Sequence, residues 1–250
     1  MFANLTQTYR TRIFQLCLSA VIGLSFAAVP HDLSAEGKWR SFNPEWKTSC
    51  GVDKGAIKRK GKNYVFTTST NQCVSRGTFT QRSEIYGKKI DVNRPMNYMF
   101  TSSIRLNASS NQSFTMFQVH DGRGSCSPPL KLDWHSDNRL RFRSSYSLDK
   151  GVADCVYNNE MTNVRYSGPR LRRDGTAYKL QVVVKFDGAS GFSTTVFIDG
   201  KRVMSGTYRP PTDVKFYKST KYYLKHGVYS RDMWKYQFAS TGVSVMRQKP

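Results

Sequence analysis

Short runs of alternating apolar and polar residues fill the chain from residue 36 onward. The runs are rich in β-branched and aromatic residues and are separated by clusters of Gly, Asn, Ser and Pro. This pattern is typical of β-strands joined by turns, and no long stretch shows the 3.6-residue apolar spacing of a helix. We expect strands at residues 63–70, 113–120, 139–146, 178–186, 194–206 and 222–229. Regular turn spacing without helices predicts an all-β sandwich of two antiparallel sheets.

One turn and one loop can be placed from local sequence. The segment VFIDGKRV, residues 196–203, has Asp199-Gly200 between two strand-like runs. Asp-Gly favours a two-residue hairpin because both turn positions need positive φ. Residues 147–175 lack a strand pattern and predict a long loop over a sheet face.

The first 35 residues have the layout of a secretory signal peptide. Arg10 and Arg12 precede an apolar run at residues 13–28, and small residues offer cleavage after Ala27, Ala28 or Ala35. The alternative is a membrane anchor, but this run is shorter than the ~20 apolar residues of a spanning helix. We therefore expect a secreted or periplasmic protein, with residues 36–250 forming one domain that acts as a monomer. No later segment is apolar enough to predict membrane contact after cleavage.

The net charge of +22 comes from 39 Lys and Arg against 17 Asp and Glu. Removal of residues 1–35 leaves 37 basic and 16 acidic residues, a net charge of +21. This charge favours a polyanionic partner: nucleic acid, an anionic membrane or an acidic polysaccharide. The chain has no nucleic-acid-binding motif, and export also argues against that partner.

Four cysteines remain after Cys17 leaves with the signal peptide. An even count in an exported chain predicts two disulfides. Of three connectivities, the most local pairs Cys50 with Cys73 and Cys126 with Cys155. A metal site is the rival, but no clustered Cys/His spacing supports it. We expect no metal or other cofactor, and no motif supports a Ca²⁺ requirement.

Three strand segments each present one face with polar, chemically capable side chains. Residues i and i+2 of a strand point to the same side. This rule groups Arg82 with Glu84; Gln118 with His120, Met116 and Phe114; and Tyr223 with Lys225, Gly227 and Tyr229. The opposite face of the last segment, Tyr222, Leu224, His226 and Val228, suits a core. Gly227 is expected to leave room for a ligand to approach the backbone.

In this order, the three segments resemble the motifs of jelly-roll polysaccharide lyases. The alginate lyase 2 group carries R-(S/T)-E-L, Q-(I/V)-H and Y-F-K-x-G-x-Y-N-Q. Here they read RSEI at residues 82–85, QVH at 118–120 and YLKHGVY at 223–229. Proteins that resemble heparin lyase I and glucuronan lyase share this plan. Ser230-Arg231 stands where alginate lyases have Asn-Gln. The added positive charge favours a resemblance to the heparin-lyase-like group over the alginate lyases.

The resemblance implies a concanavalin A-like β-jelly roll and β-elimination on a 4-linked uronic-acid polymer, which yields a 4,5-unsaturated uronate end. Arg82 and Gln118 would neutralise the substrate carboxylate. His120 is a candidate base, and Tyr229 would protonate the leaving oxygen or act as both base and acid. Substrate binding is assigned to the following residues: Lys225, Glu84 (as support for Arg82), Tyr223, Arg231, Arg141 and Arg143. His135 is expected at a loop or strand end.

Two other functions fit parts of this pattern. A non-catalytic module that binds acidic carbohydrates would keep the basic and aromatic contacts without needing the His120–Tyr229 pair. A glycoside hydrolase would need two facing carboxylates about 5–9.5 Å apart. No strand here carries an E-x-D-x-E type pattern, which argues against hydrolysis.

Overall fold

The computed structural model describes residues 37–73, 80–124, 126–148 and 154–250, which belong to one compact unit, Glu36–Pro250. The predicted signal peptide lies outside the described residues. Within the described ranges, no helix has the length and apolar character needed to cross a bilayer.

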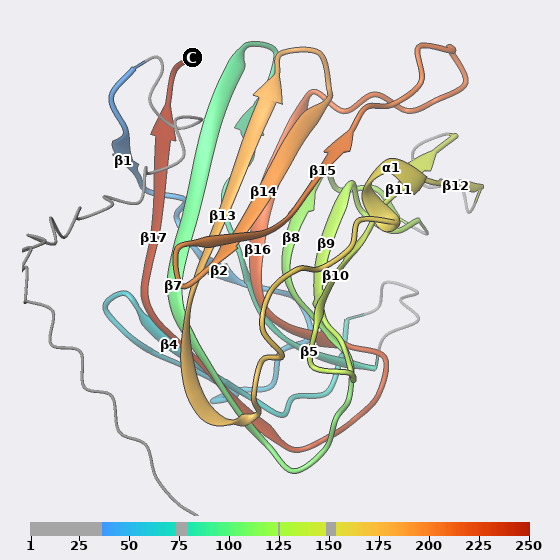
Figure 1. Cartoon of the computed structure of the whole chain (residues 1–250). Coiled ribbons are helices and arrows are strands. Elements are labelled where there is room, and N and C mark those ends of the chain that lie inside the picture. The colour runs from blue at the N-terminus through green and yellow to red at the C-terminus, as the bar shows by residue number, and fades with distance from the viewer. Residues whose placement is uncertain (1–36, 74–79, 125, 149–153) are drawn as a thin grey trace, which may run out of the picture. The chain divides into compact units, whose positions relative to one another are not determined.

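Two large antiparallel sheets make up this unit (Figure 1). Sheet A has the strand order β15-β14-β13-β7-β17-β4-β3, with β1 also paired to β17. Its strands are β1 (Arg40–Phe42), β3 (Ile57–Lys60), β4 (Asn63–Thr67), β7 (Pro95–Ala108), β13 (Asp174–Asp187), β14 (Phe192–Ile198), β15 (Lys201–Tyr208) and β17 (Tyr236–Gln248).

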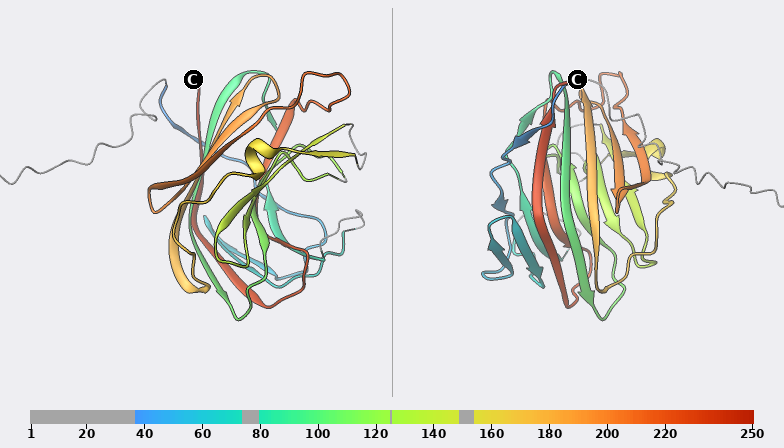
Figure 2. Two further views of the ribbon diagram at one scale, coloured as in Figure 1. Left: turned by 45° about the vertical axis from the view of Figure 1, so that its right-hand side comes forward. Right: turned by 60° about the vertical axis from the view of Figure 1, so that its left-hand side comes forward.

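Sheet B has the order β10-β9-β8-β16-β5-β2, with β6 also paired to β16. Its strands are β2 (Lys47–Thr48), β5 (Gln81–Tyr86), β6 (Ile90–Asp91), β8 (Phe114–His120), β9 (Leu130–Trp134), β10 (Leu140–Arg143) and β16 (Lys221–Ser230). The two sheets face each other as layers (Figure 2). The predicted all-β jelly-roll sandwich is confirmed.

Apolar side chains from both sheets meet between the layers and form one core. Phe100 of sheet A packs on Phe117 of sheet B, with ring centres 5.1 Å apart. His226, on the predicted core face of β16, is fully buried. Its Nδ1 lies 2.9 Å from the Met116 carbonyl oxygen and its Nε2 2.7 Å from Ser240 Oγ. The first contact is to β8 within sheet B, and the second joins sheet B to β17 of sheet A. Both ring nitrogens are therefore used inside the core, which leaves His226 no role in surface chemistry.

The predicted hairpin turn is present between β14 and β15. Asp199 and Gly200 have φ values of 51° and 80°, and Ile198 pairs with Lys201 across the turn. Positive φ at both positions is the reason for the Asp-Gly preference.

The prediction of an unbroken loop at residues 147–175 was wrong in part. β11 (Ser145–Ser147) pairs with β12 (Cys155–Tyr157), and the short helix α1 (Asn159–Thr162) follows. The Asn158 side chain accepts a hydrogen bond from the Met161 amide and caps this helix. Burial of Met161 in the core fixes the turn, and so short an element has no periodicity to detect.

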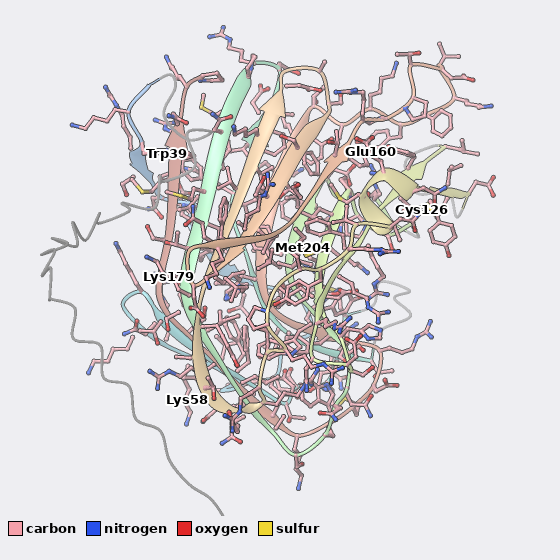
Figure 3. All side chains as sticks on the ribbon, viewed as in Figure 1. Trp39, Lys58, Cys126, Glu160, Lys179 and Met204 are labelled. Carbon is pink, nitrogen blue, oxygen red and sulfur yellow. A yellow bond between two sulfur atoms is a disulfide. The ribbon has the colours of Figure 1, made fainter. Side chains whose placement is uncertain are left out.

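The two expected disulfides are present, and they have the most local of the three connectivities, Cys50–Cys73 and Cys126–Cys155. Cys126 is labelled in Figure 3, in the region of β12 and α1. The second bridge joins the segment after β8 to β12.

The predicted face of Phe114 was wrong. Phe114 belongs to the core, where it packs against Trp134 and Phe238, and Met116 is also a core residue. The pairing of β8 with β9 shifts register between Thr115 and Phe117. This bulge interrupts the two-residue alternation, so Thr115 points to the side of Gln118 instead and bonds Asp133.

Candidate active site

Three adjacent strands of sheet B bring the predicted site residues together. β16 lies between β8 and β5. Tyr229 pairs with Arg82 on one side, and Lys225 pairs with Gln118 on the other. Side chains at paired positions lie side by side on the same face. The candidate catalytic residues therefore share one face of sheet B, opposite the core.

Glu84 is the central carboxylate of this face and is only 1% exposed. Its two oxygens contact different partners: Oε1 accepts a hydrogen bond from Gln118 Nε2, and Oε2 forms an ion pair with Lys225 Nζ. Arg82 Nε is more distant, 3.9 Å from Oε2. Glu84 was predicted mainly to support Arg82, but its shorter contacts are to Gln118 and Lys225. Burial lowers the pKa of Lys225, and the charge of Glu84 opposes that shift.

Arg82 is positioned by a disulfide and by an aromatic ring. Its Nη1 lies 3.0 Å from Cys50 Sγ and 3.4 Å from the Cys50 carbonyl oxygen. Its guanidinium carbon stands 4.4 Å from the centre of the Tyr229 ring. Arg82 Nε has no hydrogen-bond partner among the described residues. A buried, unused donor beside a tyrosine suits recognition of a ligand carboxylate.

Three cations surround the ring of Tyr229. Besides Arg82, the ammonium groups of Lys225 and Lys131 lie 5.6 Å and 5.7 Å from the ring centre. Burial raises the pKa of Tyr229, and Arg82 opposes that rise. The phenol is therefore protonated at neutral pH, while the surrounding cations favour its anion once the proton is lost.

His120 ends β8 and stacks on Tyr223 of β16. The two rings are 5.1 Å apart at an interplanar angle of 17°, and Tyr223 Oη lies 3.3 Å from His120 Nδ1. The backbone amide of Gly122 donates to the same Nδ1 at 2.8 Å. Burial, followed by the charges of Lys225 and Lys131, holds the pKa of His120 well below its usual value. The imidazole is neutral at physiological pH.

Lys131 and Asp133 are site residues that the sequence reasoning missed. Both are buried on β9, where Lys131 pairs with Gln118 and Asp133 with Thr115. Burial, with a further contribution from Arg143, lowers the pKa of Lys131 to about 8. The sequence does carry a signal for these two residues. In LKLDW, residues 130–134, Lys131 and Asp133 alternate with apolar residues, as the other site residues do in their strands.

The predicted substrate-binding arginines lie together at one end of the site. A pocket of about 430 Å³ is lined by Ser113, Asp133, His135, Arg141, Phe142, Arg143, Thr162, Tyr229, Arg231 and Asp232. Arg143 is ion-paired with Asp133, and Arg141 with Asp137. This pocket adjoins Tyr229, and its lining offers both basic and acidic side chains to a ligand. His135 lies in the turn after β9, as expected.

The expected role of Gly227 was wrong. A Cβ at this position would lie 2.4 Å from the Ser83 carbonyl oxygen and 2.7 Å from Glu84 Cα. Its φ of 138° also lies in a region that other residues rarely adopt. The glycine is required because β5 packs closely on β16 here, and it does not open space for a ligand.

The described residues contain no group of three or more His, Cys, Asp or Glu side chains arranged to hold a metal ion.

Comparisons with known proteins identify the fold. No protein-family model matches the chain. No curated protein matches it either. Among solved structures, alginate lyase A1-II', a member of polysaccharide lyase family 7, superposes with a TM-score of 0.55 at 15% identity, over 82% of this chain and 95% of that one.

Two further structures of the same lyase also match. A Tyr-to-Phe variant in complex with the product GGG has a TM-score of 0.53 at 15% identity, covering 80% of this chain and 93% of that one. A variant with His-to-Asn and Tyr-to-Phe replacements, in complex with the substrate GGMG, has a TM-score of 0.51 at 15% identity and covers 82% and 93%. The chain therefore has the jelly-roll fold of a family 7 alginate lyase, with its buried polar residues on one face of sheet B.

Proposed function

We propose that this protein is a secreted or periplasmic polysaccharide lyase that cleaves a 4-linked uronic-acid polymer by β-elimination. The observation that carries the proposal is the convergence of Arg82, Gln118, His120, Lys225 and Tyr229 on one face of sheet B. Each residue type matches a need of that reaction, and the lyase-like fold is consistent with it.

The difficult step is removal of the C5 proton beside an ionised carboxylate. The site must neutralise that carboxylate and stabilise the negative charge that grows in the transition state. Arg82 offers the donors of its guanidinium, and Gln118 has a second amide hydrogen besides the one given to Glu84. His120 and Tyr229 provide the groups that bind or transfer protons.

The neighbouring structures support this choice of residues. The family 7 lyase was crystallised with a substrate after one histidine and one tyrosine had been replaced, and with a product after a tyrosine had been replaced. The proposed site depends on one histidine and one tyrosine as well.

Redox chemistry and charge support export and the substrate class. Two disulfides are typical of proteins outside the cytoplasm. The net charge of +22 favours an anionic polymer. We include alginate, glucuronan and heparin-like glycans as candidate substrates, and we expect a monomer without nucleic acid or a required cofactor.

The proposal is tested by incubating the exported protein with a panel of uronate polymers and recording near-ultraviolet absorbance from 4,5-unsaturated ends. We expect product with at least one polymer and its loss in Tyr229→Phe. Binding to acidic polymers without product from any of them would instead identify a non-catalytic carbohydrate-binding module.

A further inference from the structure

The strands of sheet A carry far more basic than acidic side chains. Ten Lys and Arg residues lie on these strands, against two acidic residues, Asp174 and Asp187, which are the first and last residues of β13. Asp174 is already ion-paired with Arg172. The strands β3, β4, β7 and β17 contain no acidic residue. Sheet A is therefore a basic layer.

One row of paired residues crosses four strands of sheet A with a cation at each end. In order across β3, β4, β17 and β7, its members are Lys58, Val65, Ala239 and Arg105. Paired side chains lie on the same face of a sheet. Their neighbours in sequence, Phe66, Phe238 and Ile104, belong to the core. The row therefore lies on the face of sheet A that points away from sheet B and from the candidate active site.

Two more cations lie on this outer face. Lys179 of β13 pairs with Ser103 of β7, which pairs with Thr241 of β17. Lys60 shares the face of Lys58 because it lies two residues further along β3. Lys58 and Lys179 are labelled in Figure 3. The surface formed by Lys58, Lys60, Arg105 and Lys179 is called the basic face below.

The charged groups of the basic face are exposed and not neutralised. All four residues are exposed, and among the described residues none of them forms an ion pair with a carboxylate. Asp199, in the turn between β14 and β15, accepts a hydrogen bond from the Lys179 backbone amide. Lys60 on β3 and Lys179 on β13 are four strand spacings apart, about 19 Å at about 4.8 Å for each spacing. A linear polyanion can follow charges spread in this way.

Protection of a sheet edge explains only part of this pattern. β3 is the last strand of sheet A, and lysines on an edge strand discourage pairing with another chain. Arg105 and Lys179 lie on β7 and β13, which have a paired strand on both sides. Cations on interior strands do not protect an edge, so these two need another explanation.

We propose that the basic face binds an anionic polysaccharide chain, separately from the candidate active site on the opposite side of the sandwich. The choice of ligand class rests on the proposed function, but this binding needs no catalysis. The partly exposed side chains of Val65, Ala239 and Ser103 lie between the cations and are small, which leaves a low surface for sugar rings. No large apolar side chain projects from these rows to enter a membrane, and a second copy of the chain would be repelled by like charge.

A second binding surface changes how the protein acts on long polymers. Binding at one site raises the effective concentration of the same polymer at the other site. A long chain gains from both surfaces. An oligosaccharide that is too short to reach round the sandwich gains nothing from the basic face.

The first test compares a variant of the basic face with a matched control. The face variant is Lys58→Gln/Lys60→Gln/Arg105→Gln/Lys179→Gln. The control removes the same number of charges from exposed residues in loops and is Lys89→Gln/Arg94→Gln/Arg209→Gln/Lys218→Gln. Every protein in this test, the parent included, also carries Tyr229→Phe so that the polymer is not consumed.

Binding to soluble heparin, alginate and glucuronan is titrated at low ionic strength. Each exposed ion pair contributes about two- to threefold to affinity. We therefore expect the face variant to bind at least one of these polymers about 30-fold more weakly than the parent, and the control less than about threefold more weakly. Equal weakening of both variants would show that net charge alone drives binding and would overturn the proposal, as would a parent that binds none of the polymers.

Lysine acetylation, read by mass spectrometry, locates the bound polymer. Polymer should slow the acetylation of Lys58, Lys60 and Lys179 and leave Lys89 and Lys218 unchanged. Unchanged rates at the first three with polymer bound would place the polymer elsewhere and overturn the proposal. Protection by phosphatidylglycerol vesicles without protection by any polymer would identify a membrane surface and would also overturn it.

Activity separates this inference from the proposed function. With Tyr229 restored, the face variant should keep the parental kcat/KM on short oligosaccharides and show a raised KM on long polymer, whereas the control should match the parent on both. An unchanged KM on long polymer would contradict the tethering role. Absence of unsaturated product from every polymer would overturn the lyase function, and the binding and acetylation results would still decide whether the basic face holds a polysaccharide.

Discussion

Removal of the Cys50–Cys73 disulfide should impair catalysis, whereas removal of Cys126–Cys155 should not. The two bridges span 23 and 29 residues. The chain-entropy relation gives about 3.4 and about 3.6 kcal/mol of stabilisation for loops of these lengths. The double variants Cys50→Ala/Cys73→Ala and Cys126→Ala/Cys155→Ala are thus a matched pair in stability, and alanine leaves no acceptor in place of the sulfur.

The two bridges differ in what they touch. Cys50 Sγ accepts a hydrogen bond from Arg82 Nη1 at 3.0 Å. A hydrogen bond to a charged group contributes about 1.5–3 kcal/mol, and sulfur is a weak acceptor, so we use the lower end of this range. A loss of about 1.4 kcal/mol in transition-state binding corresponds to about tenfold in kcat/KM.

The assay measures initial rates of unsaturated product at a temperature where urea titration shows each variant fully folded. We expect kcat/KM to fall about tenfold without Cys50–Cys73 and to change less than twofold without Cys126–Cys155. Equal activity of the two folded variants would refute the positioning role of the first disulfide.

Three further predictions concern stability and substrate binding. Burial lowers the pKa of His226 to about 3, whereas an unfolded histidine has about 6.5. Below pH 6.5 the unfolded state therefore gains protons that the folded state does not, and by pH 4.5 stability falls by roughly 2.7 kcal/mol. Urea titrations at pH 7 and 4.5 should show a loss that is larger by about this amount in the parent than in His226→Gln, which keeps the loss due to His120, another histidine with a lowered pKa; equal losses would contradict it. Lys131, with a pKa of about 8, loses its charge at higher pH, so KM should rise above pH 8 in the parent and stay level in Lys131→Met. Gly227→Ala, whose Cβ would lie 2.4 Å from the Ser83 carbonyl oxygen, should lose more than about 3 kcal/mol, while Gly242→Ala, with positive φ but open space, should lose about 1 kcal/mol.

Local sequence rules predicted the strands and their faces where the pairing is regular. Lys225 and Tyr229 share the site face of β16 as predicted, and His226 points to the core. The same rule failed at Phe114, because a bulge shifts the register of β8 and depends on pairing with β9. A bulge is a property of the pairing between two strands, so it cannot be recognised from the sequence of either strand alone.

The sequence by itself determined the all-β fold, the Asp-Gly turn and the candidate residues on three strands, and it left three disulfide connectivities open. Alternation and turn chemistry depend on neighbours within a few residues, so they can be read along the chain. The tertiary structure decided which groups meet: Glu84 with Lys225 and Gln118, Arg82 with Cys50, and Lys131 with the Tyr229 ring. It also decided the surroundings of His120, because the Gly122 amide and the Tyr223 ring that contact it can be placed only in the folded chain.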